Sequence, residues 1–123
     1  MPDSSNGPAA FKAEITVFIL VKTQPEWLAL SVDQRFEQVG IHVAPILIKH
    51  AEKVRLRFYD VEFYSARVTD IWVWEAADHH AYQLLIEDLR TTPMWDKYFQ
   101  VIEILAGVED AYATNNNRAP VGT

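Results

Sequence analysis

The sequence of 123 residues predicts an α+β protein of the ferredoxin-like class, βαββαβ, with a four-stranded antiparallel sheet and the helices on one face. Two segments repeat their apolar residues with the period of an amphipathic helix. Four other segments are alternating or β-branched, as strands are, and the two kinds follow each other in this order. The length gives room for one such domain.

The first half of the chain predicts one strand and a divided helix. Residues 15–21, ITVFILV, are β-branched and aromatic without helical spacing, which is typical of a buried strand. Pro25 suits the first turn of a short helix. Ser31 opens an S-x-x-Q capping box, so a longer helix begins there. Pro45 lies inside the apolar stripe of that helix and predicts a kink or a break.

The second half predicts a hairpin, a second helix and a last strand. Residues 54–65 alternate as a strand, and residues 70–75 form the next one after a short connection. Asp78 is a good N-cap for the helix HHAYQLLIEDLR, which Pro93 stops. The segment 98–105, YFQVIEIL, completes the sheet.

Composition sets the limits of the domain and of its partners. Residues 1–10 and 113–123 are rich in small and polar residues, and we expect disordered tails on either side of a domain over 11–112. A net charge of −6, with scattered Lys and Arg, argues against nucleic acid. The N-terminus has no signal-peptide pattern and no apolar run is long enough for a bilayer, so no membrane contact is expected. The lack of cysteine fits the cytoplasm.

The predicted first strand is apolar on both faces. Val17, Ile19 and Val21 point one way, whereas Phe18 and Leu20 point the other way. Two helices cover only one face of the sheet, which leaves a large apolar surface bare. We therefore expect a homodimer that packs sheet against sheet through an isologous interface.

Three segments carry a family resemblance: FILVKTQPEWLAL, RLRFYDVEFYSARVTDIWVWE and TTPMWDKYFQVIEILAGVEDAY. Over residues 18–112 the chain resembles darcynin, a bacterial family of small proteins within the dimeric α+β barrel superfamily. This resemblance implies the dimeric α+β barrel fold. Relatives in that superfamily include cofactor-free monooxygenases of polyketide quinones, polyketide cyclases, haem-degrading enzymes and ligand-sensing domains, so the resemblance implies small-molecule chemistry or binding.

The apolar face of the predicted strand 54–65 ends at Asp60 and Glu62. Either a β-bulge at residues 59–60 switches the two faces, or one face changes from apolar to acidic along its length. Two carboxyl groups two residues apart suit general acid and base catalysis, because the charge of one can keep the other protonated. The alternative is a solvated edge whose carboxylates pair with the nearby arginines.

Arginines and aromatic residues on the same hairpin complete the predicted site. Arg57 is expected to stabilise an oxyanion, and Arg67 to orient an anionic substrate. Trp72 and Trp74 share a face and present an aromatic wall for a planar ligand. The predicted substrate-binding residues are Trp27, Tyr59, Tyr64, Arg67, Trp72 and Trp74. The alternative is that these strand aromatics belong to the core or to an interface.

Two histidines are further candidates for the catalytic base. His42 and His50 are eight residues apart and lie near one face of the first long helix. The spacing of His and carboxylates matches no zinc motif, and no glycine-rich phosphate loop is present, so we expect neither a metal nor another cofactor. Haem held by one histidine is a minor alternative that the superfamily resemblance leaves open.

These features predict a cofactor-independent enzyme that acts on an aromatic or polyketide-like molecule by proton abstraction, as a cyclase, isomerase or monooxygenase of secondary metabolism. Asp60, His42 or His50 is the base, Glu62 tunes Asp60, and Arg57 meets the oxyanion. One alternative is a non-catalytic dimer that binds or senses a small molecule. Another is a structural dimer with its aromatics in the interface. A cavity of a few hundred Å³ between sheet and helices, with Asp60 or a histidine facing it, would favour a ligand site.

Overall fold

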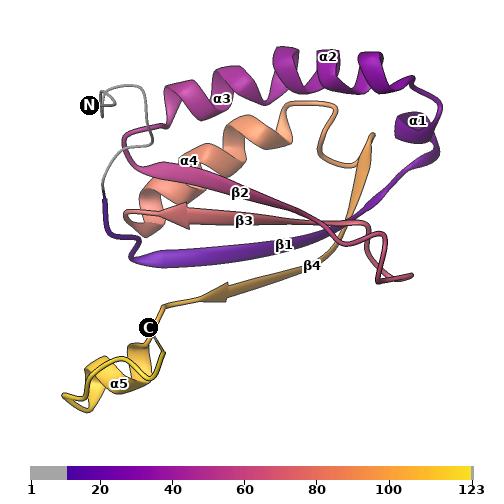
Figure 1. The fold of residues 1–123 in the computed structure, drawn as a ribbon. Coiled ribbons are helices and arrows are strands. Elements are labelled where there is room, and N and C mark those ends of the chain that lie inside the picture. The colour runs from indigo at the N-terminus through magenta and orange to yellow at the C-terminus, as the bar shows by residue number, and fades with distance from the viewer. Residues whose placement is uncertain (1–10, 123) are drawn as a thin grey trace, which may run out of the picture.

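The computed structural model describes residues 11–122 and has the predicted βαββαβ order, with short additional helices. Its sheet is antiparallel, with the strand order β2-β3-β1-β4. The strands are β1 (Ile15–Thr23), β2 (Val54–Asp60), β3 (Asp70–Ala76) and β4 (Phe99–Gly107). Figure 1 shows α2, α3 and α4 on the same side of this sheet. The predicted fold class, a ferredoxin-like α+β fold with a four-stranded antiparallel sheet and helices on one face, is confirmed.

The helices begin and break where their capping residues predict. They are α1 (Pro25–Leu28), α2 (Val32–His42), α3 (Ala44–Lys49), α4 (His79–Arg90) and α5 (Ala111–Asn115). Ser31 Oγ accepts from the Gln34 backbone N–H, and the Gln34 side chain accepts from the Ser31 N–H, which completes the capping box. Pro45 lies in the first turn of α3, so the long helix is split there. Asp78 caps α4 through the N–H of Ala81 at 2.7 Å.

The core lies between the sheet and these helices. Val17, Ile19 and Val21 of β1 are buried there, together with Leu85 and Leu89 of α4. The predicted faces of β1 are therefore confirmed, because the alternate residue Phe18 lies on the other side and is 40% exposed. None of the helices within residues 11–122 has both the length and the apolar character that a membrane span requires.

The predicted strand over 54–65 is too long, because β2 ends at Asp60. Directly after it, the N–H groups of Tyr64 and Ser65 both donate to the carbonyl oxygen of Val61, at 2.9 and 3.0 Å. The Ser65 hydroxyl then accepts from the backbone N–H groups of Arg67 and Val68. These bonds close a loop over residues 61–69 that strand-like alternation of the side chains does not reveal.

The face of β2 changes from apolar to acidic without a β-bulge. The pairing of β2 with β3 runs in one unbroken register from Val54↔Ala76 to Asp60↔Asp70. The bulge of this sheet lies elsewhere, where the pairing of β1 with β4 shifts between Leu20 and Val21. The unbroken register excludes a bulge at residues 59–60, and the change of face character holds only as far as Asp60, because Glu62 lies in the loop after β2.

The two predicted tails fall in different positions relative to the described structure. The N-terminal tail, 1–10, lies outside the described residues. Figure 1 shows α5 beyond the end of β4, and its residues 113–115 overlap the predicted C-terminal tail. Ala113 of this helix is buried. The domain limits at 11 and 112 stay predictions.

Candidate functional site

The side chains of the β2–β3 hairpin are divided between the two faces of the sheet, because successive strand residues point in opposite directions. The helix-side face carries Leu56, Phe58, Asp60, Asp70, Trp72 and Trp74. The open face, which none of the described helices covers, carries Arg55, Arg57, Tyr59, Ile71, Val73 and Glu75. The residues of the predicted site therefore do not form one group.

A cavity of about 460 Å³ lies between the helix-side face and the helices. Its walls are aromatic, from Trp27, Phe58, Trp72, Trp74 and Phe99. Aliphatic side chains of α2 and α3 close the other side. A cavity of this size with few polar groups is typical of a small-molecule site. We call it the helix-side cavity.

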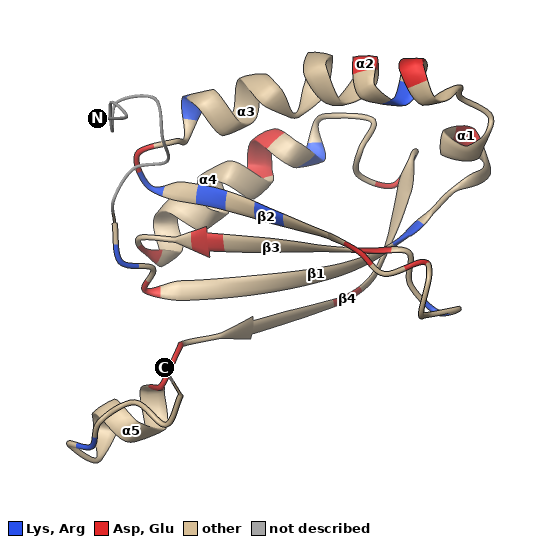
Figure 2. Ribbon diagram, viewed as in Figure 1, with Lys and Arg blue, Asp and Glu red and all other residues tan. Residues whose placement is uncertain are grey.

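Two carboxyl groups line one end of the helix-side cavity. Asp60, the last residue of β2, is exposed, whereas its register partner Asp70 is only 4% exposed. Figure 2 shows acidic segments gathered where β2 ends and β3 begins. Sequence reasoning did not single out Asp70. Its position two residues before Trp72 places both on one face, and that signal could have identified it.

The pKa of Asp70 is raised to about 7 from its ordinary value of 3.8. Burial is the largest cause, because it disfavours the charged form. The hydrogen bond from Thr69 Oγ1 to Asp70 Oδ2, 2.7 Å long, acts in the opposite direction. Asp60 and the charge of Glu62 raise the pKa further. Near neutral pH, Asp70 can therefore hold or release a proton.

Arg35 of α2 is the arginine that lines the helix-side cavity. Its Nε donates to the carbonyl oxygen of Trp27 and its Nη2 to that of Leu28, both at 3.2 Å. These bonds tie α2 to α1 and use part of the donor set of the guanidinium. The remaining N–H groups can meet an oxygen of a ligand. Sequence reasoning missed Arg35 because the direction of a helical side chain depends on how its helix packs.

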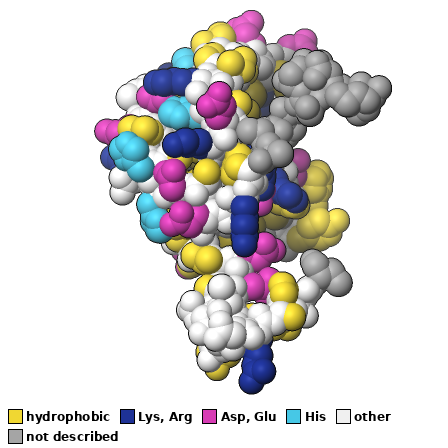
Figure 3. Space-filling model, turned by 90° about the vertical axis from the view of Figure 1, so that its left-hand side faces the viewer, with side chains coloured by type: hydrophobic (Ala, Val, Ile, Leu, Met, Phe, Trp, Pro, Cys, Tyr) yellow, Lys and Arg dark blue, Asp and Glu magenta, His cyan; other side chains and the backbone are white. Residues whose placement is uncertain are grey.

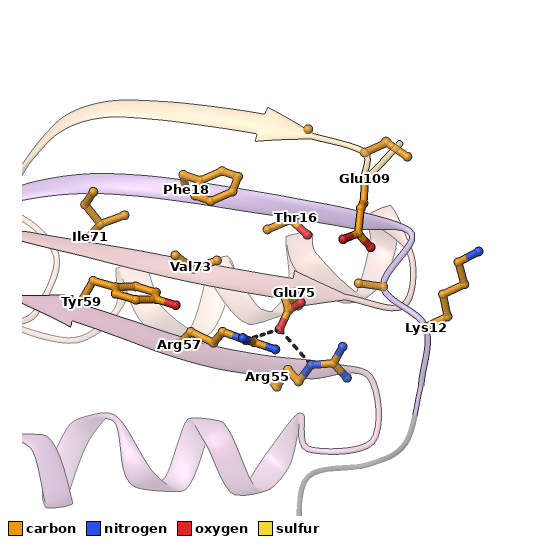
Figure 4. Close-up of a pocket in the computed structure, with 13 residues that line it drawn as sticks. Lys12, Thr16, Phe18, Arg55, Arg57, Tyr59, Ile71, Val73, Glu75 and Glu109 are labelled. Carbon is orange, nitrogen blue, oxygen red and sulfur yellow. Dashed lines mark hydrogen bonds and ion pairs between the residues drawn. The ribbon is translucent and has the colours of Figure 1, made fainter. Parts of the chain in front are cut away.

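The open face holds the arginine that we expected in the site. Arg55 Nε and Arg57 Nε both donate to Glu75 Oε1 at 2.9 Å, as the dashed lines in Figure 4 show. Burial raises the pKa of Glu75, but the hydrogen bonds from both arginines outweigh it and leave that pKa below its ordinary value. Tyr59 lines the same open-face cavity of about 690 Å³. Arg57 and Tyr59 are thus separated by the sheet from the helix-side cavity.

The other predicted residues of the hairpin lie in or near the loop after β2. Glu62 is exposed, and its carboxylate oxygen lies within 4.8 Å of those of Asp60 and Asp70. Tyr64 is 91% exposed. Arg67 forms an ion pair with Glu103 at 3.4 Å. None of these three lines the helix-side cavity.

The ion pairs contradict the pairing that the solvated-edge interpretation expected, although Asp60 and Glu62 are both exposed as it requires. A solvated edge required Asp60 and Glu62 to pair with the arginines of the hairpin. Instead, Arg55 and Arg57 pair with Glu75, and Arg67 pairs with Glu103. Within residues 11–122 the two carboxylates form no ion pair.

The histidines lie away from the helix-side cavity, and none is among its described lining residues. His50 Nε2 lies 2.7 Å from Asp88 Oδ2, a contact that ties α3 to α4. His42 is the last residue of α2 and is half-buried. Figure 3 shows histidines among charged side chains on the end of the molecule where α3 stops and α4 starts. A haem iron in the helix-side cavity would therefore find no histidine ligand among the described residues.

Within residues 11–122, one group of carboxylates could reach a common cation: Asp60, Glu62 and Asp70. Divalent magnesium or calcium prefers such oxygen ligands. An acidic cluster alone does not define a metal site, because exposed acidic groups often lie together without a cation.

Solved structures with a similar fold include a mutant of the chlorite dismutase from Candidatus Nitrospira defluvii. It aligns with a TM-score of 0.71 at 17% identity, over 85% of this chain and 44% of that chain. A putative chlorite dismutase aligns with a TM-score of 0.64 at 22% identity, over 84% and 44%. The chain thus spans less than half the length of these proteins, and the likeness concerns the fold alone.

Sequence relatives are much more similar. A darcynin homologue from Granulibacter bethesdensis is 57% identical over 112 residues, 91% of this chain and 90% of the relative. Another from Streptomyces avermitilis is 57% identical over 109 residues, 89% of this chain and 90% of the relative. The family model described as "Darcynin, domain of unknown function" matches residues 2–123. The chain belongs to the darcynin family.

Proposed function

We propose that this protein is a small-molecule enzyme that binds an aromatic or polyketide-like substrate in the helix-side cavity and moves a proton on it, as a cyclase, isomerase or monooxygenase. The observation that carries the proposal is the combination of an aromatic cavity of about 460 Å³ with two carboxyl groups at one end. Asp60 is the base, and proton transfer itself needs no bound cofactor. A cytoplasmic location is part of the proposal, which the lack of cysteine favours.

The lining of the cavity favours a flat and mostly apolar substrate. Trp27, Trp72 and Phe99 pack edge to face or tilted, with ring centroids 4.9 and 5.3 Å apart, so they form a continuous wall. Such a wall stacks on a ring system and gives a sugar little to bind. Arg35 is the cation that would meet a phenolate, an enolate or a carboxylate. It takes the oxyanion role that we expected of Arg57.

The four tryptophans provide the test of binding. Their indole N–H groups each give a separate signal in a ¹H–¹⁵N spectrum of the full chain, and 2-naphthol is a suitable planar probe. We expect 2-naphthol to move the signals of Trp27, Trp72 and Trp74, which line the cavity, and to leave that of Trp95, which does not. Equal shifts of all four signals, or none, would contradict the proposed site.

A matched pair of variants in α2 controls this experiment. Val39→Phe places a larger side chain in the cavity and should weaken binding of 2-naphthol about tenfold or more, since overfilling a packed space costs about 1–3 kcal/mol. Ile41→Phe changes an exposed residue of the same helix that does not line the cavity, and it should leave binding unchanged. Binding without turnover of any enolisable compound would favour the sensing dimer instead.

We further propose that the open face is covered by a second copy of the chain. Phe18, Leu105 and Val108 are exposed there at 40%, 49% and 52%, so the apolar area is large. Charge is compatible with a second copy, although Arg57 already pairs with Glu75 and Glu103 with Arg67 in the same chain. Arg57 lies on β2 and Glu103 on β4, at opposite edges of the sheet, and a twofold axis parallel to the strands would face β2 of one copy with β4 of the other.

Sedimentation at micromolar concentration tests the dimer. We expect twice the monomer mass of 14.1 kDa. Phe18→Glu should give monomers, because it places a charge in the centre of the interface. Phe63→Glu changes an exposed residue of the loop after β2 and should remain dimeric. A wild-type protein that stays monomeric would refute the interface.

A further inference from the structure

The final residue pair of the β2–β3 register brings two carboxyl groups together. Asp60 and Asp70 are direct partners, and both line the helix-side cavity. An oxygen of each lies within 4.8 Å of an oxygen of the other and of Glu62. Two adjacent carboxylates repel each other, and the repulsion grows when one of them is buried, as Asp70 is.

The described residues give this pair no cation. Arg55 and Arg57 are on the open face with Glu75, and Arg67 is with Glu103. Lys22 of β1 donates to the carbonyl oxygen of Ala66, at 3.4 Å. Arg35 of α2 lines the cavity but is tied to backbone carbonyls of α1. Glu62 adds a further negative charge. Because no side chain among these supplies a positive charge to the pair, a proton can neutralise one of the two carboxylates.

The cavity places the aspartate pair beside a space that a ligand can fill. Asp60 and Asp70 line the same cavity as Trp27, Trp72 and Phe99, so an apolar ring system held by these aromatic side chains would lie beside both carboxyl groups. Trp74 lies deeper in this wall at 1% exposure, and its indole Nε1 is a buried donor for which residues 11–122 offer no acceptor.

We infer that Asp60 and Asp70 share one proton and act together as base and acid on a mostly apolar carbonyl compound. This inference rests on the proposed function of the helix-side cavity and identifies its reacting groups. Thr69 is a positioning residue, because its hydroxyl holds Asp70 Oδ2 at 2.7 Å and leaves Oδ1 for the proton. The unshared carboxylate of Asp60 then points to the substrate from the exposed end of the cavity.

The step is balanced without an oxidant. Asp60 removes a proton from the carbon next to the carbonyl group, and the C–H electron pair becomes the C=C bond of an enol. Asp70 gives its proton to the carbonyl oxygen, whose C=O π electrons form the new O–H bond. In a conjugated substrate, Asp60 returns its proton to another carbon and Asp70 recovers its own. The product is an isomer, and the pair is restored.

Carboxyl ¹³C NMR of the full chain over pH 3–9 tests the shared proton without a substrate. We expect one aspartate with a midpoint near 7, and Asp70→Asn should remove that signal. Asp60→Asn should lower the midpoint of Asp70, because it removes an interacting carboxylate. Asp33→Asn, an exposed aspartate of α2, should change neither. If Asp70→Asn does not fold, the shared proton is still tested by two measurements. These are the pH midpoint of the wild-type signal and the change in that midpoint in Asp60→Asn.

Three outcomes would overturn the inference. The first is that every aspartate titrates below about pH 5. The second is a midpoint of Asp70 that Asp60→Asn leaves unchanged. The third is stoichiometric binding of Mg²⁺ at neutral pH with a shift of both signals, which would mean two deprotonated ligands. If 2-naphthol binds but the aspartate signals have ordinary pH midpoints, only the shared proton is refuted. If Asp70 has a midpoint near 7 but 2-naphthol does not bind, only the proposed function is refuted.

Discussion

On the open face, Glu75 accepts hydrogen bonds from Arg55 and Arg57, whereas on the helix-side face Asp60 and Asp70 lie together and form no ion pair within residues 11–122. Both groups belong to the same hairpin. The first group carries opposite charges that satisfy each other at a partly solvated surface. The second concentrates like charges beside an aromatic cavity. The ion pairs of Glu75 therefore indicate a role in stabilising the sheet. The two aspartates beside the cavity indicate a role in proton transfer.

The largest expected difference between the faces concerns catalysis. Asp60→Asn keeps the shape of the side chain but removes the proton acceptor, so turnover of a carbonyl substrate should fall by roughly two to four orders of magnitude. Arg57→Met, on the open face, should leave turnover close to that of the wild type. Single-turnover rates measure both. Equal losses in the two variants would mean that the sheet does not separate two functions.

Stability against pH gives the next largest effect. The folded pKa of Asp70 is raised to about 7 from 3.8, so the wild type loses stability as the pH rises through this window. Asp70→Asn has no such charge, and at pH 8 it should be more stable than the wild type by up to about 4 kcal/mol, since one pKa unit corresponds to about 1.4 kcal/mol. Urea unfolding at pH 4 and pH 8 measures this. The advantage should be absent at pH 4, and a variant that is less stable at pH 8 would contradict the raised pKa.

A binding experiment tests whether Arg35 is the residue that contacts a negatively charged ligand. Arg35→Met should weaken binding of 2-naphthoate about tenfold or more, since a hydrogen bond to a charged group contributes about 1.5–3 kcal/mol. Neutral 2-naphthol should bind Arg35→Met almost as well as the wild type. Arg57→Met is the matched control on the open face and should bind both probes normally. Calorimetric titration measures these affinities. A loss of binding that occurs only in Arg57→Met would mean that the ligand binds on the open face.

The smallest effect belongs to the open-face charges. Glu75→Gln weakens two ion pairs at once but leaves both arginines near solvent, so it should cost about 1 kcal/mol at pH 7. The folded pKa of Glu75 is lowered, and its contribution is therefore present above about 4.5 and lost as the pH falls through the folded value. Unfolding at pH 7 and pH 3 should show a smaller cost at pH 3 than at pH 7. A larger cost at pH 3 would contradict it.

Local signals predicted most of the fold because they act through near neighbours in sequence. The capping box at Ser31, the break at Pro45 and the cap at Asp78 each depend on contacts within a few residues. The overlong second strand shows where this fails. The loop after Asp60 is closed by backbone bonds to Val61, which alternation cannot encode.

The site residues could be predicted from the sequence only on the strands, where the alternation of side chains sets the face to which each one points. Trp72 and Trp74 share a face by the period of two, and they line the same cavity as Asp60. Arg57 has the opposite parity to Asp60, so the same rule already separated them. Asp70 and Arg35 were missed for other reasons. The burial of Asp70 and the direction of Arg35 arise from packing between segments distant in sequence.

The strand order also bears on how the folded protein avoids association through its sheet edges. β2 is an edge strand, so one side of its backbone offers unpaired N–H and C=O groups to any other chain. Charged side chains on such a strand hinder the growth of a continuous intermolecular sheet, because added strands would stack like charges. Arg55 and Arg57 occupy two of the seven positions of β2. Replacing both with valine should therefore promote aggregation before it affects the cavity.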